Sequence, residues 1–121
     1  MIGYVTVGSN NLPRAFAFYD ALLGEIGAKR SFDSDTFVAW GIKRGPALAV
    51  VKPFNGEAAT VGNGTMVALA MRTKEDVDSV YAKAISLGAT DEGPIGPRGE
   101  GFYAGYFRDL DGNKLCAFFM G

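Results

Sequence analysis

The sequence contains no histidine and only one cysteine, Cys116, among its 121 residues. The absence of histidine excludes imidazole both as a metal ligand and as a general base. A single cysteine excludes an internal disulfide and fits a reducing compartment. One thiolate without imidazole also falls short of the roughly four donors that zinc requires.

No charge of one sign predominates, because twelve Lys and Arg face thirteen Asp and Glu, for a net charge of −1. A nucleic-acid surface needs clustered cations, so nucleic-acid binding is not expected. No apolar run approaches the roughly 18 residues of a membrane span, and Met1 to Tyr4 lack the basic segment that opens a signal peptide. We therefore expect a soluble, cytoplasmic protein without a membrane partner.

The composition predicts one globular domain that spans residues 1–121. Hydrophobic residues make up 48% of the chain and charged residues 21%, and this balance argues against disorder. A chain of this length buries roughly two-thirds of the surface that it exposes when unfolded. Any smaller modules within the chain must therefore share a core.

The second half of the chain repeats the first at a spacing of about 62 residues. The clearest matches are residues 4–7 with 66–69, Tyr19 with Tyr81, and Gly27-Ala28 with Gly88-Ala89 after a slip of one residue. Further matches join 37–40 to 102–105 and 48–50 to 115–117. The chain is thus an internal duplication.

Each half is predicted to run strand, helix and three strands. In the first half we expect a strand at 2–7, a helix from an N-cap among Ser9, Asn10 and Asn11 to about Gly24, and strands at 28–33, 36–42 and 47–53. In the second half we expect a strand at 65–71, a helix from the cap Thr73 to Gly88, a short strand at 89–92, a loop at 93–101, and strands at 102–108 and 114–119.

The duplicated pattern, the Phe18-Tyr19 pair in the first helix and the closing segment from Arg108 to Leu115 resemble the vicinal oxygen chelate superfamily. That superfamily includes glyoxalase I, extradiol dioxygenases, fosfomycin-resistance transferases and bleomycin-resistance proteins. Leu110 stands where the closing motif usually has proline. The resemblance covers almost the whole chain and implies an α+β fold of two tandem β-α-β-β-β modules, residues 1–54 and 64–121, which form a curved mixed sheet around a cavity.

The resemblance also implies where a divalent metal would bind, on the first and last strands of the modules. Those positions hold Tyr4 where His or Gln is expected, Ala49 or a neighbour where Glu can stand, Met66 where His is expected, and Cys116 where Glu is expected. None of these is a family-type ligand. We therefore expect neither a bound metal nor another cofactor.

Strand alternation predicts which side chains line the cavity, because residues two apart share a face. The predicted cavity set pairs Tyr4 with Thr6, Met66 with Ala68, and Cys116 with Phe118. The alternate residues are uniformly apolar and are expected to pack under the helices: Val5, Val7, Val67, Leu69, Leu115 and Ala117. Such a cavity is expected to bind a ligand mainly through apolar contact area, with one phenol and one thiol as its few polar groups.

The candidate ligand-binding residues are Tyr4, Trp40, Met66, Arg98, Tyr103 and Cys116. Five of them, all but Met66, have a structural alternative. The two tyrosines either orient a ligand oxygen or pack, Trp40 is a stacking platform or a plug, and Arg98 belongs with Glu100 to a mobile lid or to a solvated loop. Cys116 is a reactive or a structural thiol, and it has no histidine as its base. No catalytic residue is assigned.

Three functions remain open. The first is a metal-independent small-molecule-binding protein, similar in that respect to the bleomycin-resistance proteins. The second is a metal-independent lyase-like or isomerase-like enzyme of the same superfamily, glyoxalase-like if an enzyme, with Tyr4, Tyr103, Arg98 or Glu100 in proton transfer or oxyanion stabilisation. The third is a catalytically silent structural or regulatory subunit. A homodimer is expected in each case, with the modules paired within one chain or across two.

Overall fold

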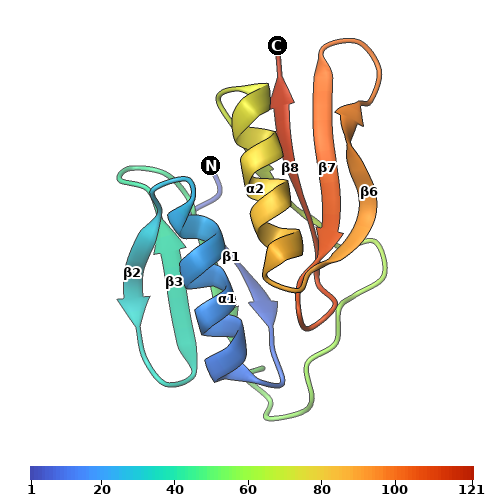
Figure 1. Ribbon diagram of the computed structural model, residues 1–121. Helices are drawn as coiled ribbons and strands as arrows, with labels where there is room; N and C mark the ends of the chain where they lie inside the picture. Colours follow the sequence, from blue (N-terminus) through green and yellow to red (C-terminus); the bar gives the residue numbers. More distant parts are fainter. The chain divides into compact units, whose positions relative to one another are not determined.

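The computed structural model describes all 121 residues, and these form two compact units, Met1–Val61 and Gly62–Gly121. Each unit consists of one four-stranded sheet and one helix that lies over a single face of that sheet (Figure 1). The α+β class and the tandem β-α-β-β-β organisation expected from the sequence are confirmed. Neither helix is long and apolar enough to cross a membrane.

The first unit contains five elements: β1 (Tyr4–Gly8), α1 (Leu12–Gly24), β2 (Lys29–Asp33), β3 (Phe37–Gly41) and β4 (Ala47–Val51). Its sheet has the order β1-β4-β3-β2. Strand β1 runs parallel to β4, and the other two pairs are antiparallel. The parallel pair is therefore joined through α1 and a hairpin, and β2 forms an edge.

The second unit repeats this connectivity with β5 (Val67–Ala70), α2 (Lys74–Ser86), β6 (Thr90–Pro97), β7 (Phe102–Arg108) and β8 (Lys114–Met120). Its sheet has the order β5-β8-β7-β6, again with one parallel pair, β5 and β8. The two sheets thus place equivalent segments of the repeat in equivalent strands.

Both helices begin at the caps that the sequence predicts. The side chain of Asn11 accepts a hydrogen bond from the backbone N–H of Arg14, and that of Thr73 accepts one from the N–H of Asp76. These bonds satisfy backbone donors that the first turn of a helix leaves without partners. Pro13 lies in the first turn of α1, where its missing N–H costs nothing.

One face of each sheet packs under its helix. In the first unit Trp40 contacts Tyr19 of α1, and cross-strand pairing puts Leu48 and Val5 on the same face. In the second unit Tyr103 is bonded to Asp78 of α2, and the register puts alternate residues of β8 on that face. The helix-facing set predicted from alternation is confirmed by this register: Val5, Val7, Val67, Leu69, Leu115 and Ala117.

The two units fill the space under their helices differently. Trp40 is 2% exposed and lies 5.6 Å from the Tyr19 ring, measured between centroids. At the repeat-equivalent position of the second unit stands Gly105, where an added Cβ would come within 2.8 Å of the Tyr81 ring. In the first unit a large side chain of the sheet, Trp40, fills the space under the helix. In the second unit a side chain of the helix, Tyr81, fills the corresponding space above Gly105. Trp40 is thus buried beneath α1.

Strand β6 is longer than the sequence indicates, since residues 93–97 belong to it and not to a loop. It is an edge strand with two register irregularities, so Pro94 and Pro97 are accommodated without an N–H. The guanidinium of Arg98 donates to the carbonyls of Pro94, Gly96 and Pro97. These bonds stabilise an irregular backbone that period-two alternation cannot reveal.

Candidate functional site

The face of the first sheet that is turned away from α1 carries three aromatic rings above a floor of small residues. Tyr4 of β1 meets Phe37 of β3 edge to face, with centroids 6.1 Å apart and planes at 74°. Phe32 of β2 meets the same Phe37 ring at 5.5 Å and 87°. Tyr4 is 62% exposed and Phe32 is 57% exposed, so these rings are held toward solvent instead of packing in the core. Exposed apolar groupings of this kind mark binding surfaces.

These rings border a hollow of about 530 Å³. None of its lining side chains is charged, and the floor is made of small residues: the lining consists of Gly3, Tyr4, Ser31, Phe32, Phe37, Ala39 and Ala47. The Tyr4 phenol has no hydrogen-bond partner in the protein. The hollow can therefore take a flat apolar group and offer it one phenol.

A β-bulge brings Phe32 to this hollow. Arg30 pairs with Trp40 and faces α1, whereas Phe32 pairs with Ala39 and faces the opposite side. Regular alternation would put residues 30 and 32 on one face, and the register shift between them separates them. Neither Phe32 nor Phe37 is among the residues predicted from the sequence, and only Phe37 follows from alternation with Ala39.

Phe37 also borders a second hollow on the first unit, of about 630 Å³. This hollow is more polar, with hydroxyl and amide groups and Lys52 as its one charged side chain; its lining includes Thr6, Thr36, Lys52, Asn55 and Thr60. Its wall is the segment after β4, which the Asn10 amide fastens by two hydrogen bonds to the backbone of Ala59, 3.1 and 2.7 Å long. Gly8 allows this approach, because a Cβ there would lie 2.8 Å from that of Ala59.

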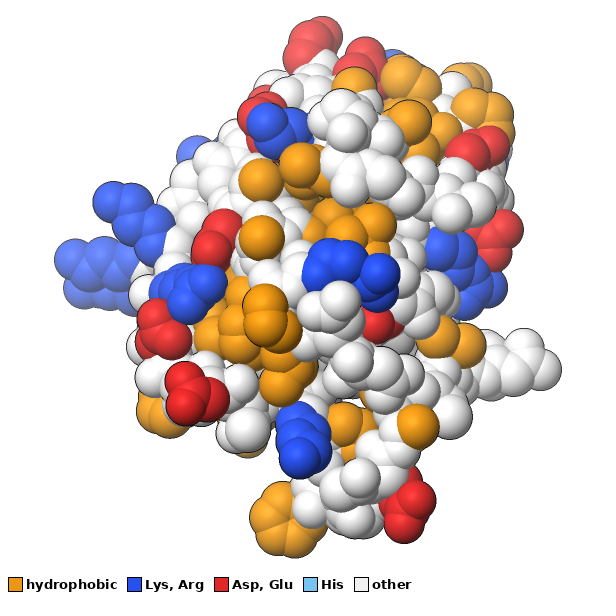
Figure 2. All heavy atoms as spheres, turned by 60° about the horizontal axis from the view of Figure 1, so that its bottom comes forward, with side chains coloured by type: hydrophobic (Ala, Val, Ile, Leu, Met, Phe, Trp, Pro, Cys, Tyr) orange, Lys and Arg blue, Asp and Glu red, His pale blue; other side chains and the backbone are white.

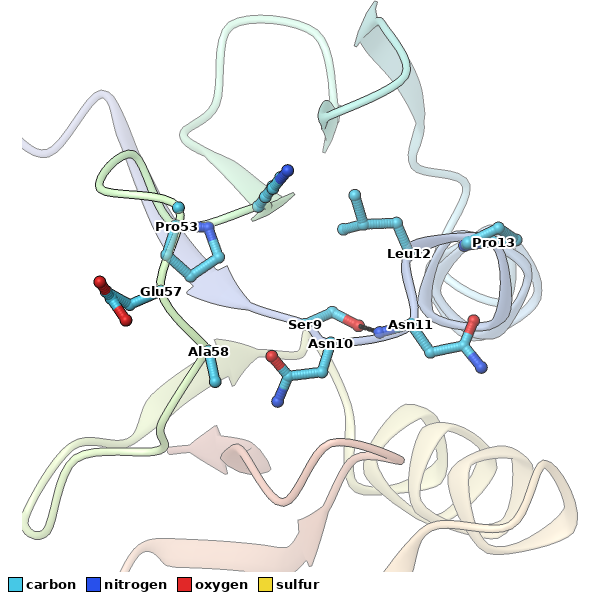
Figure 3. Close-up of a pocket in the computed structure, with 10 residues that line it drawn as sticks. Ser9, Asn10, Asn11, Leu12, Pro13, Pro53, Glu57 and Ala58 are labelled. Atoms are coloured by element: carbon cyan, nitrogen blue, oxygen red, sulfur yellow. Dashed lines mark hydrogen bonds between the residues drawn. The ribbon is translucent and has the colours of Figure 1, made fainter.

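A third hollow, of about 430 Å³, lies at the start of α1 (Figure 3). Leu12 and Pro13 border it on the helix side, and Pro53 and Glu57 border it on the side of the loop after β4. The Ser9 hydroxyl accepts a hydrogen bond of 3.0 Å from the Asn11 N–H. The Ser9 hydroxyl and the Asn11 side chain are engaged in shaping the entry to the helix, and the charged side chains that line this hollow are Lys52 and Glu57.

The second sheet also has a face turned away from its helix. Tyr106 of β7 pairs directly with Cys116 of β8, on the opposite side from the helix-facing Tyr103 and Gly105. The Arg98 guanidinium lies 5.5 Å from the Tyr106 centroid, and the Lys114 ammonium lies 5.6 Å from it. This face therefore joins an aromatic ring with two cations, of which sequence analysis singled out only Arg98.

The structure separates the six sequence-predicted candidates. Tyr4 lies on the open face of the first sheet. In the second unit the open face of the sheet carries Cys116, with Arg98 beside Tyr106, and Met66 directly precedes β5 and is 41% exposed. Trp40 and Tyr103 lie on the helix-facing sides, where the Trp40 indole donates to Asp20 and the Tyr103 phenol donates to Asp78. These two side chains are engaged within the protein.

The pKa values of Tyr81, Tyr103 and Cys116 are all raised, away from neutral pH. The hydrogen bond to Asp78, with desolvation, raises the pKa of Tyr103 above its ordinary value. Burial, aided by the bond to Asp91, raises the pKa of Tyr81 to about 12. Burial also raises the pKa of the Cys116 thiol, which is 1% exposed. A nucleophilic thiol requires the opposite shift, so Cys116 has the character of a structural thiol.

The residues at the family's metal-binding positions do not fit a divalent metal. They supply a phenol at Tyr4, a methyl group at Ala49, a thioether at Met66 and a buried thiol at Cys116. Hard divalent cations prefer carboxylate, carbonyl and water oxygens, and imidazole suits the softer ones. No group of three or more His, Cys, Asp or Glu side chains lies close enough to hold an ion elsewhere in the chain.

Comparison with known proteins agrees with this architecture. The sequence profile of the Glyoxalase/Bleomycin resistance protein/Dioxygenase superfamily matches residues 1–117. A glyoxalase/bleomycin resistance protein from Albidiferax ferrireducens has a similar structure, with a TM-score of 0.92 and 35% identity, over 100% of this chain and 99% of that one. No protein of curated function matches the chain.

More distant structures share the fold. A glyoxalase/bleomycin resistance protein/dioxygenase family enzyme from Burkholderia phytofirmans is 20% identical, with a TM-score of 0.81 over 98% of both chains. A lactoylglutathione lyase from Agrobacterium tumefaciens is 18% identical, with a TM-score of 0.74 over 98% of this chain and 92% of that one. The two tandem β-α-β-β-β units thus define a glyoxalase-like fold. The chain belongs to the glyoxalase/bleomycin resistance protein/dioxygenase superfamily.

Proposed function

We propose that this protein binds a small molecule with a flat apolar ring on the open face of its first sheet, and that it does so without a metal. The observation that carries the proposal is the hollow of about 530 Å³ bordered by Tyr4, Phe32 and Phe37. Ligand sites are mostly apolar, with few polar groups that fix orientation, and this hollow has that character. Its aromatic walls favour a ring that meets them edge to face or offset-stacked.

The adjoining, more polar hollow supports a ligand with two unlike ends. Both hollows include Phe37, so a molecule that passes this ring reaches Lys52, Asn55 and Thr60. Those side chains bind oxygen-rich groups, and Lys52 adds a positive charge. The ligand class that fits best is therefore a planar ring that bears a short polar substituent.

Binding is favoured over catalysis by the state of the reactive groups. Tyr103 is bonded to Asp78 with a raised pKa, and Cys116 is buried with a raised pKa. A catalytic base or nucleophile needs a pKa near the working pH and access to the reacting atom. The unengaged phenol of Tyr4 suits a hydrogen bond to a bound ligand without any proton transfer.

We propose in addition that the protein is a cytoplasmic homodimer. Large hydrophobic side chains are exposed outside the hollows as well, among them Ile2 at 58%, Ile42 at 51% and Met120 at 68%. Figure 2 shows hydrophobic side chains that reach the surface between charged ones. A second copy that covers such side chains lowers the free energy of the pair through the area removed from water.

Native mass spectrometry of the purified chain, before and after dialysis against EDTA, tests these proposals. The expected spectrum contains the dimer and a bound organic molecule that remains after dialysis. A stoichiometric metal, or an organic ligand lost together with the metal, would contradict metal-independent binding. A monomer that retains the ligand would contradict the proposed homodimer but not the proposed binding.

A further inference from the structure

The ring of Tyr106 lies between cations from the two strands that flank it. Tyr106 belongs to β7, which pairs with β6 on one side and β8 on the other. Arg98 follows β6, and its guanidinium approaches Gly93 and Gly96 of that strand, while Lys114 opens β8. Both cations are within 6 Å of the Tyr106 centroid, at 5.5 and 5.6 Å. Three groups that can donate hydrogen bonds thus gather on one face.

These groups retain unused donors. The Tyr106 phenol has no hydrogen bond within the protein, in contrast to the phenols of Tyr81 and Tyr103. The Lys114 ammonium likewise has neither a hydrogen bond nor an ion pair. Two nitrogens of Arg98 donate to carbonyls of β6, which fixes the plane of the guanidinium, and its Nε remains without a partner. A fixed guanidinium binds an anion at a reduced entropic cost.

The charge on this face is not balanced. Arg108 and Lys114 lie directly opposite each other across β7 and β8, an arrangement that destabilises a sheet by itself. Glu92 forms an ion pair with Arg108 and leaves Lys114 without a carboxylate. A second acid, Asp91, is hydrogen-bonded to Tyr81 of α2 and also interacts electrostatically with Arg98. Three cations, Arg98, Arg108 and Lys114, thus stand against two acids, and Lys114 is the cation without a carboxylate partner, which leaves this face locally positive. An anionic ligand would relieve that repulsion.

We propose that Arg98, Tyr106 and Lys114 form a binding site for a small oxyanion, a carboxylate or a phosphate, on the open face of the second sheet. Carboxylate and phosphate oxygens accept charge-assisted hydrogen bonds from guanidinium and ammonium groups, and a phenol adds a neutral donor. The site is independent of the hollow proposed for the apolar ring, which is lined by residues of the first unit alone.

The purely structural alternative is that Arg98 only supports the irregular part of β6. A substitution of Lys114 distinguishes the anion site from this structural role. The Lys114 ammonium makes no hydrogen bond to the backbone, so its loss should leave the fold unchanged. The experiment titrates the 15N-labelled full chain with inorganic phosphate and, separately, with acetate, a carboxylate without a ring, at constant ionic strength set by sodium chloride. Amide shifts are followed for the wild type, Lys114→Gln, Lys114→Arg and the matched control Lys43→Gln, a lysine of the first unit.

We expect at least one of the two anions to give saturable shifts around Arg98, Tyr106 and Lys114, with a dissociation constant below about 10 mM. The Lys114→Gln variant should weaken that binding about tenfold, which is typical of one lost charge-assisted hydrogen bond. Lys114→Arg should stay within about threefold of the wild type, and Lys43→Gln should match it.

Saturation by acetate alone would identify a carboxylate site, and saturation by phosphate alone would identify a phosphate site. Shifts that stay linear for both anions, or an unchanged dissociation constant in Lys114→Gln, would overturn the proposal. The proposed site on the first sheet is tested separately, by titration with 2-naphthol. A negative result for either site therefore leaves the other proposal testable.

Discussion

The rings of Phe32 and Phe37 meet edge to face, with centroids 5.5 Å apart and planes at 87°, on the side of the first sheet that α1 leaves open. This contact exists because a bulge in β2 turns Phe32 away from the helix while Arg30 stays beneath it. The same irregularity therefore builds one wall of the apolar hollow and ties the strand to α1. Packing and the candidate site depend on one local feature of β2.

The tie between β2 and α1 gives the first prediction. The Asp20 carboxylate receives two hydrogen bonds of 2.8 Å from Arg30 and a third of 2.8 Å from the buried Trp40 indole. Asp20→Ala leaves that indole N–H without a partner, and we expect it to lower the free energy of unfolding by about 1–3 kcal/mol, measured by urea titration.

The matched control for this variant is Asp33→Ala. Asp33 binds the same Arg30 at 2.9 Å, but its side chain is 62% exposed and it has no contact with Trp40. Exposed ion pairs contribute little, so the control should cost about 0.5 kcal/mol or less. Equal losses for the two variants would contradict the role given to the indole bond.

Acid should remove the contribution of Asp20. The Arg30 hydrogen bond is the main cause that holds the pKa of Asp20 below its ordinary value, with the Trp40 bond as a further cause. A carboxyl whose pKa is lower in the folded state stabilises the fold above its unfolded pKa of about 3.9, and this effect is lost as the pH falls through the folded pKa. The stability difference between wild type and Asp20→Asn should therefore be constant from about pH 5 to 7 and shrink below about pH 4. A difference that grows toward acid pH would be inconsistent with this assignment.

The close approach of α2 to β7 gives a prediction at Gly105. An added Cβ would lie 2.8 Å from the Tyr81 ring and 2.7 Å from Ile95. Gly105→Ala should destabilise the protein by about 1–3 kcal/mol, because overpacking forces neighbouring side chains out of place. Gly24→Ala is the control, since nothing lies within 4 Å of a Cβ at that position. Thermal unfolding of both variants would show whether helix and sheet are as close as described.

Cys116 should behave as an inert thiol. It is 1% exposed, and burial raises its pKa, so the reactive thiolate is scarce at neutral pH. Iodoacetamide should alkylate it at pH 8 at least about a hundredfold more slowly in the native protein than in denaturant, as followed by mass spectrometry. Similar rates in the two states would show an accessible thiol and reopen a nucleophilic role.

Much of the architecture could be predicted from the sequence because the repeat and the strand alternation both depend on local patterns. Thr73 and Asn11 cap their helices as expected, since capping needs only the cap residue and the following backbone. The face of each strand that packs under a helix was also accessible. Every such position follows from period-two alternation once one buried residue of the strand is known.

The site could be predicted only in part, because it depends on features without a local signature. A single extra residue at the bulge moves Phe32 to the opposite face, and nothing in the sequence marks that insertion. The helix-facing positions of Trp40 and Tyr103 follow from the register of β3 and β7 against their neighbours. The cations around Tyr106 meet only after β6, β7 and β8 have paired.

The central claim is that the open face of the first sheet binds a flat ring without a metal, and a titration tests it most directly. The EDTA-dialysed protein is titrated with 2-naphthol, a neutral planar probe, while the ring resonances of Tyr4, Phe32 and Phe37 are followed by NMR. We predict saturable shifts confined to these rings, and a dissociation constant at least about tenfold higher in Phe37→Ala. Binding that begins only after a divalent metal is added, or that is unchanged in Phe37→Ala, would contradict the claim.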